Sequence, residues 1–153
     1  MAQAMGEIGM GDAKQPVHGG GCLCGHVRFE AVGEPCEPVG NCHCRLCQKA
    51  SGAAFVTWAI FPMDAVTWLN APPKWFRSTD FAERGFCPEC GAPVAIHDFE
   101  ARTVDLPVVL FDDPDAFAPQ DDIWLESRRA WVALDPRLTH FQHSGSEVEN
   151  ESE

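Results

Sequence analysis

Length, composition and charge exclude several classes of protein at the outset. The chain has 153 residues, 45% of them hydrophobic, and its 23 acidic against 11 basic residues give a formal net charge of −12. This length predicts one globular domain. No apolar run approaches the roughly twenty residues of a membrane span. The acidic balance argues against nucleic acid or an anionic membrane as a partner, because both interactions depend on clustered Lys and Arg.

The two ends of the chain lack any periodic pattern. Residues 1–16 are rich in small side chains, and residues 144–153, SGSEVENESE, are acidic without anchoring apolar groups. We therefore predict a disordered N-terminal arm over 1–16, a zinc-binding domain over 17–143 and an acidic disordered tail over 144–153. The N-terminus also lacks the basic start and apolar core of a signal peptide, which favours a cytoplasmic location.

Between these ends, short runs rich in aromatic and β-branched residues predict strands. In HVRFEAV, residues 26–32, apolar and polar side chains alternate, which is typical of a strand with one buried face. AAFVTWAIF, residues 53–61, is apolar on both faces and predicts a central strand that ends before Pro62. A hairpin or corner is predicted for residues 66–70 and 74–78. Two more strands are predicted for residues 93–99 and 103–111, and Pro107 in the second indicates an edge or a bulge.

Residues 122–134, DIWLESRRAWVAL, are ambiguous between helix and strand. Propensity alone leans slightly to helix. The many short strands elsewhere still predict a mainly β domain, with two layers or a partly open barrel. Because aromatic side chains dominate small β cores, the five tryptophans are expected in the core.

Two pairs of cysteines lie far apart in the sequence. FCPECGAP places Cys87 and Cys90 two residues apart before a glycine, and GGCLCGH places Cys22 and Cys24 between glycines. In a reducing compartment such spacings indicate metal ligands more often than disulfides. We expect the four sulfurs to form one closed zinc site that joins two distant loops and stabilises the fold. The alternative is four buried thiols that bind no metal.

Three further cysteines, Cys42, Cys44 and Cys47, lie within NCHCRLCQKASG, residues 41–52. Three thiolates leave one corner of a tetrahedral zinc site open to a substrate. The alternative is a second closed site, whose fourth ligand would be His43, Cys36 or a distant histidine. His43 lies between two ligands and is poorly placed to reach the same metal, and Cys36 is otherwise expected to be a small buried hydrophobe.

Cationic side chains near this cluster could steer an anionic substrate. Arg45 and Lys49 are neighbours in sequence, and Arg77 is expected to arrive from a strand of the same sheet. The alternative is that all three are ordinary surface cations. We take Arg45 and Lys49 as candidate substrate-binding residues.

The succession GGCLCGHVRFE, NCHCRLCQKASG, GFCPECGAPVAI and IWLESRRAW resembles the glutathione-dependent formaldehyde-activating enzyme (GFA) family, which includes centromere protein V. The resemblance spans roughly Val17 to Phe141. It implies a zinc-bearing β-tent fold, a structural zinc on Cys22, Cys24, Cys87 and Cys90, and a catalytic zinc on Cys42, Cys44 and Cys47. It also implies that DIWLESRRAW is largely extended, and we adopt that expectation in place of the helix.

The activity that this resemblance implies is addition of glutathione to formaldehyde, which is a carbon–sulfur lyase reaction. Three thiolates make a bound zinc a poor Lewis acid for hydrolysis, whereas a soft thiol suits its fourth position. The expected partners are therefore a small thiol and an aldehyde, with a homo-oligomer left open. The rival reading is a non-catalytic zinc module for protein contact. A methionine sulfoxide reductase of the B type is set aside, because no cysteine follows Cys90.

Overall fold

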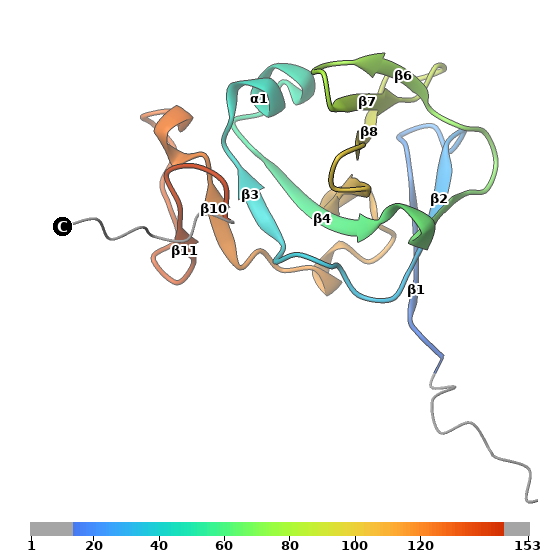
Figure 1. Cartoon of the computed structure of the whole chain (residues 1–153), viewed down its shortest axis with the longest axis horizontal. Helices are drawn as coiled ribbons and strands as arrows, with labels where there is room; N and C mark the ends of the chain where they lie inside the picture. The colour runs from blue at the N-terminus through green and yellow to red at the C-terminus, as the bar shows by residue number, and fades with distance from the viewer. Residues whose placement is uncertain (1–13, 146–153) are drawn as a thin grey trace, which may run out of the picture.

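A computed structural model describes residues 14–145 of the chain. Most of the predicted N-terminal arm and residues 146–153 of the predicted tail lie outside the described residues. The described part is mainly β, as predicted, and forms a single domain with one α-helix (Figure 1). None of its helices is long and apolar enough to cross a membrane.

The strands form two sheets. A sheet of three has the order β1-β2-β5, and a sheet of eight has the order β11-β10-β3-β4-β9-β8-β7-β6. The strand bounds are β1 Val17–Gly21, β2 Arg28–Val32, β3 Gly40–Cys42, β4 Val56–Pro62, β5 Val66–Trp68, β6 Lys74–Arg77, β7 Ala82–Phe86, β8 Pro93–Asp98, β9 Thr103–Pro107, β10 Asp121–Ile123 and β11 Thr139–His140. The helices are α1 Arg45–Ser51 and the 3₁₀ helices η1 Met63–Ala65, η2 Val108–Leu110, η3 Pro114–Ala116 and η4 Leu125–Ser127.

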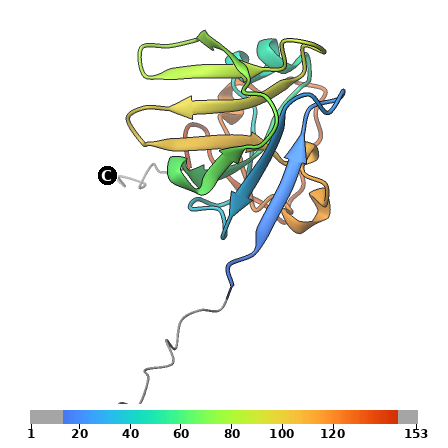
Figure 2. The same cartoon turned by 90° about the vertical axis from the view of Figure 1, so that its right-hand side faces the viewer.

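The core lies between the small sheet and one face of the large sheet. In Figure 2, β1 and β2, in blue, run steeply past the green and yellow strands of the large sheet. The alternation predicted for residues 26–32 is confirmed, because Val27, Phe29 and Ala31 are all fully buried. They pack in one cluster with Ala59 and Phe61 of β4. Burial of this apolar face supplies the main favourable free energy of folding.

The opposite face of the large sheet carries Cys42, Trp58 and Ile60, which line a cavity. Strand β4 is central, as predicted, and its residues alternate between the two faces. Antiparallel pairing places Trp58 opposite Gly40 of β3, and Ile60 opposite Asp105 of β9. Strand β10 pairs parallel with β3, which places Ile123 beside Cys42. Segments far apart in the sequence thereby meet on one face.

Three expectations need correction. Residues 122–134 form no α-helix, and they are extended only at their start, because β10 ends at Ile123 and the 3₁₀ helix η4 follows. Pro107 marks neither an edge strand nor a bulge: β9 lies between β4 and β8, and Pro107 is its last residue, beyond the part of β9 that pairs with β8. Trp131 is 76% exposed and lies outside the core.

Helix α1 was not expected from the sequence, although its end signals are present. Cys44 is the N-cap residue, and its sulfur accepts a hydrogen bond from the Cys47 amide. Gly52 ends the helix with φ of 72°, a left-handed conformation that favours glycine. Helix α1 begins three residues after β3 ends, and the turn between them brings the sulfurs of Cys42, Cys44 and Cys47 close together.

Candidate metal centres and their cavity

The two distant cysteine pairs meet in space. The sulfurs of Cys22, Cys24, Cys87 and Cys90 all lie within 4.8 Å of one another. The Cys22–Cys24 and Cys24–Cys87 sulfur distances are 3.7 and 3.8 Å. Four sulfurs at about 2.3 Å from a tetrahedral zinc would be about 3.8 Å apart. The four thiols therefore fit a closed tetrahedral site, and this cluster can hold a metal ion.

Backbone amides support the sulfurs of this cluster. The Val27 amide donates to Cys22 Sγ at 3.3 Å, and the Cys90 amide donates to Cys87 Sγ at 3.5 Å. Gly91 has φ of 76° and closes the knuckle with a 2.8 Å bond to the Cys87 carbonyl. Amides directed at a sulfur stabilise its thiolate form, which is the form that binds metal.

The second cluster is local in sequence. Cys42 ends β3, Cys44 caps α1 and Cys47 lies in its first turn, and their three sulfurs also lie within 4.8 Å of one another. Cys42 is 5% and Cys47 3% exposed. Hydrogen bonds from the thiols of Cys42 and Cys47 lower the pKa of Cys44, and the charge of Arg84 lowers it further. This cluster can also hold a metal ion.

Arg84 is the cation that approaches these thiols, and it was missed from the sequence. Its Nη2 lies 3.7 Å from Cys47 Sγ. Arg84 belongs to β7, where it pairs with Ile96, so strand register alone brings it to the face that carries Cys42. No local pattern around residue 84 indicates this proximity, because β7 and α1 are far apart in sequence.

The residues considered as a fourth ligand lie elsewhere. His43 is fully buried, and its Nε2 is 2.8 Å from Asp122 Oδ1, in a network that ties β10 to β3. Cys36 is exposed, which corrects the expectation of a buried hydrophobe, and its thiol donates to the Ile60 carbonyl at 3.4 Å. Within residues 14–145, neither belongs to the three-thiol cluster.

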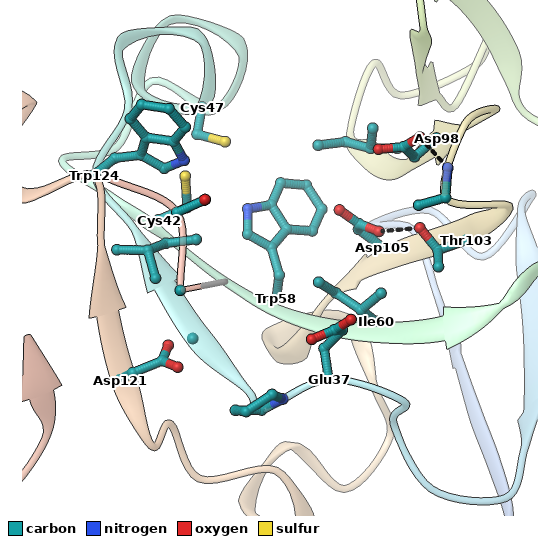
Figure 3. A pocket seen from close by; sticks show the side chains of 17 residues that line it. Glu37, Cys42, Cys47, Trp58, Ile60, Asp98, Thr103, Asp105, Asp121 and Trp124 are labelled. Atoms are coloured by element: carbon teal, nitrogen blue, oxygen red, sulfur yellow. Dashed lines mark hydrogen bonds between the residues drawn. The ribbon is translucent and has the colours of Figure 1, made fainter. Parts of the chain in front are cut away.

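The three-thiol cluster opens into a cavity of about 370 Å³. Cys42 and Cys47 line it together with the apolar side chains of Ile60, Ile96 and Ile123 (Figure 3). Trp58 separates it from a second cavity of about 290 Å³, which Arg84 lines. The free side of the cluster therefore faces a space large enough for a small substrate.

The far side of the larger cavity is acidic. Glu37, Asp98, Asp105 and Asp121 line it, and among the described lining residues there is no Arg or Lys. Burial raises the pKa of Asp105 to about 7, although a hydrogen bond from Thr103 opposes the shift. Burial also raises the pKa of Asp121 to about 6, with the charges of Asp122 and Glu37 adding to it. The acidic lining therefore disfavours an anionic group inside the cavity.

The three predicted cations lie outside this lining. Arg45 and Lys49 are exposed on α1, each two residues from Cys47, and side chains two apart on a helix do not face each other. Arg45 donates to Gln48 Oε1 at 2.5 Å. Arg77 lies on the same sheet, as expected, but in its edge strand β6, where its guanidinium lies over the Phe99 ring.

Comparison with known proteins identifies a family that this chain resembles over most of its length. The model of the family described as glutathione-dependent formaldehyde-activating enzyme matches residues 17–127, which include both cysteine clusters. A protein of Halomonas elongata, named as a candidate glutathione-dependent formaldehyde-activating enzyme, is 25% identical over an alignment of 127 residues that covers 77% of this chain and 81% of that protein. An uncharacterized lyase of Schizosaccharomyces pombe is 32% identical over 77 residues, which are 50% of this chain and 54% of that protein.

A solved structure shows the same fold. The crystal structure of a Rhodobacter sphaeroides protein matches 80% of this chain and 98% of its own with a TM-score of 0.53, at 16% sequence identity. At that identity the likeness concerns the fold alone. The family match spans most of the domain and all seven clustered cysteines, and the chain therefore belongs to the glutathione-dependent formaldehyde-activating enzyme family.

Proposed function

We propose that this protein is a zinc-dependent carbon–sulfur lyase that adds a small, glutathione-like thiol to an uncharged aldehyde such as formaldehyde. The observation that carries the proposal is the three-thiol cluster, whose free side faces a cavity of about 370 Å³. Family membership supports the reaction class. The acidic lining supports an uncharged electrophile, because carboxylates would repel an anionic one.

In this proposal the two clusters have different tasks. Cys22, Cys24, Cys87 and Cys90 hold a structural zinc, and Cys42, Cys44 and Cys47 hold a catalytic one. Zinc bound at the second cluster would keep a substrate thiol ionised near neutral pH. Ile60, Ile96 and Ile123 give the cavity apolar walls, which would reduce the hydration of the attacking sulfur and so favour its nucleophilicity.

The reaction joins one thiol to one aldehyde. The thiol first loses its proton to solvent, and its sulfur then forms a bond to the carbonyl carbon. The C=O π pair moves to the oxygen, which takes a proton and becomes the hydroxyl of the adduct. Arg45 and Lys49 are assigned a supporting part, in which their charges on α1 attract the carboxylates of an approaching thiol.

Adduct formation by NMR tests the proposal. Glutathione and formaldehyde are mixed with zinc-loaded wild type, with Cys44→Ser or without protein. Of these three samples, we expect only the one with wild type to exceed the spontaneous rate, because a hydroxyl is a poor substitute for a soft thiolate. Cys36→Ser is the matched control, since Cys36 is exposed and outside both clusters, and it should keep wild-type activity. Equal rates in all samples would leave the non-catalytic zinc module as the better reading.

A further inference from the structure

Trp58 has a buried donor without a partner. Trp58 is only 7% exposed, and its indole Nε1–H has no hydrogen-bond acceptor among the described residues. Most buried polar groups in proteins are hydrogen-bonded, and leaving one unpaired is unfavourable. A donor of this kind on a residue that lines the cavity can be satisfied by an atom of a bound ligand.

The strand register directs Trp58 toward the thiols. Trp58 pairs with Gly40, and Cys42 lies two residues further along β3, so both side chains project from the same face of the sheet. Trp58 packs in one buried cluster with Cys42 and Cys47. Figure 3 shows its indole nitrogen on the side of the ring that faces Cys42, with Asp105 on the other side. The free N–H thus lies on the reactive side of the cavity.

We propose that the Trp58 Nε1–H is an oxyanion-binding donor, which hydrogen-bonds the aldehyde oxygen as the substrate sulfur attacks the carbonyl carbon. This inference rests on the proposed function. As the carbon–sulfur bond forms, the C=O π pair becomes a lone pair on oxygen, and the indole N–H stabilises that charge until water protonates it. The N–H itself stays on Trp58, and one thiol and one aldehyde give one adduct.

Other lining groups are less suited to this task. The carboxylates would repel a developing oxyanion, and the Thr103 hydroxyl already donates to Asp105. Trp124 also turns its indole nitrogen toward Cys42, but its residue is only half-buried, so water can hydrate it in the free protein. Trp58 is the donor that is already desolvated, and preorganised donors of this kind stabilise transition-state charge more than ground-state charge.

Steady-state kinetics of zinc-loaded Trp58→Phe test the proposal. Phenylalanine keeps an aromatic ring and removes the N–H. We expect kcat to fall about tenfold or more while the thiol KM stays unchanged, because the lost bond forms only with the reacting oxygen. Trp68→Phe is the control, since Trp68 lies in the small sheet against Phe29, and it should keep wild-type kcat. An unchanged kcat in a folded, zinc-loaded Trp58→Phe would overturn the proposal.

Indole NMR of the wild type gives a readout that does not depend on a variant folding. The measurement compares the Trp58 Nε1–H resonance, one of five indole signals, between the free protein and the protein saturated with S-hydroxymethylglutathione formed in situ. We expect a downfield shift of this signal, as a hydrogen bond forms. An unmoved Trp58 signal would count against the assignment. A wild type with no catalysed reaction would instead refute the proposed function, so the two failures are distinguishable.

Discussion

The two cysteine clusters use the same ligand atoms in opposite structural settings. The four-thiol cluster joins loops far apart in the chain, since Cys24 and Cys87 are 63 residues apart. None of its sulfurs lines either described cavity. The three-thiol cluster comes from one short segment, and two of its members line the larger cavity. A long-range tie constrains the unfolded chain strongly, whereas a local one constrains it little. The comparison supports the proposal that one cluster stabilises the fold and that the other takes part in the reaction.

Replacing one cysteine in each cluster gives the largest expected difference between the two clusters. Cys87→Ala leaves an incomplete closed site and removes metal-binding free energy from folding, so we expect insoluble or molten protein. Cys44→Ser is the matched variant, and we expect its melting temperature to stay within a few degrees of wild type. Thermal unfolding and zinc content measure both. A Cys87→Ala protein with wild-type melting temperature and full zinc content would contradict the assignment of a structural site.

Asp105 lines the cavity beside the three-thiol cluster, and we expect it to lower the stability of the fold at neutral pH. Burial raises the pKa of Asp105 to about 7. Between about pH 4 and pH 7, the Asp105 carboxyl is therefore protonated in the folded protein but ionised in the unfolded chain. Stability is therefore lost as pH rises from about 4 toward 7, and the loss is complete above the folded pKa. Asp105→Asn should remove the loss, so the variant should gain up to a few kcal/mol over wild type at pH 8 and much less near pH 5.

Urea unfolding at both pH values measures the Asp105 effect. The groups facing this carboxyl are Thr103, Asp98, Arg84 and Glu37, and only Arg84 among the charged ones favours its ionised form. Asp115→Asn, on the exposed 3₁₀ helix η3, is the control and should show no such pH-dependent gain. A gain that is the same at pH 5 and pH 8 would show that Asp105 titrates normally.

Replacing Arg84 tests whether zinc binding at the three-thiol cluster depends on a residue outside the segment that carries the cysteines. This replacement has the smallest expected effect. Its guanidinium lies 3.7 Å from Cys47 Sγ, so Arg84→Met removes a positive charge from beside three thiolates. We expect zinc at the three-thiol cluster to bind about tenfold more weakly, a loss typical of groups that support metal ligands. Competition with a chromophoric chelator measures it. Zinc at the four-thiol cluster should be unaffected, and equal weakening of both would contradict the local role of Arg84.

Much of the fold and both clusters followed from short-range patterns. The alternation around Phe29, the apolar run that became β4, and the spacing of Cys42, Cys44 and Cys47 all place neighbouring side chains on a common face or turn. Such patterns depend on backbone geometry over a few residues. The Cys22–Cys24 and Cys87–Cys90 pairing also followed from spacing, because tetrahedral zinc needs four ligands.

Other features depended on tertiary structure. Strand alternation and ligand spacing are local properties, so the residue pattern alone predicted a mainly β domain and two groups of cysteines able to hold metal ions. The folded structure was needed to show that Arg84 and the indole of Trp58 meet the three-thiol cluster, and that carboxylates from β8, β9 and β10 line its cavity. Those neighbours are set by pairing between strands distant in the chain, and their register depends on packing of the whole sheet.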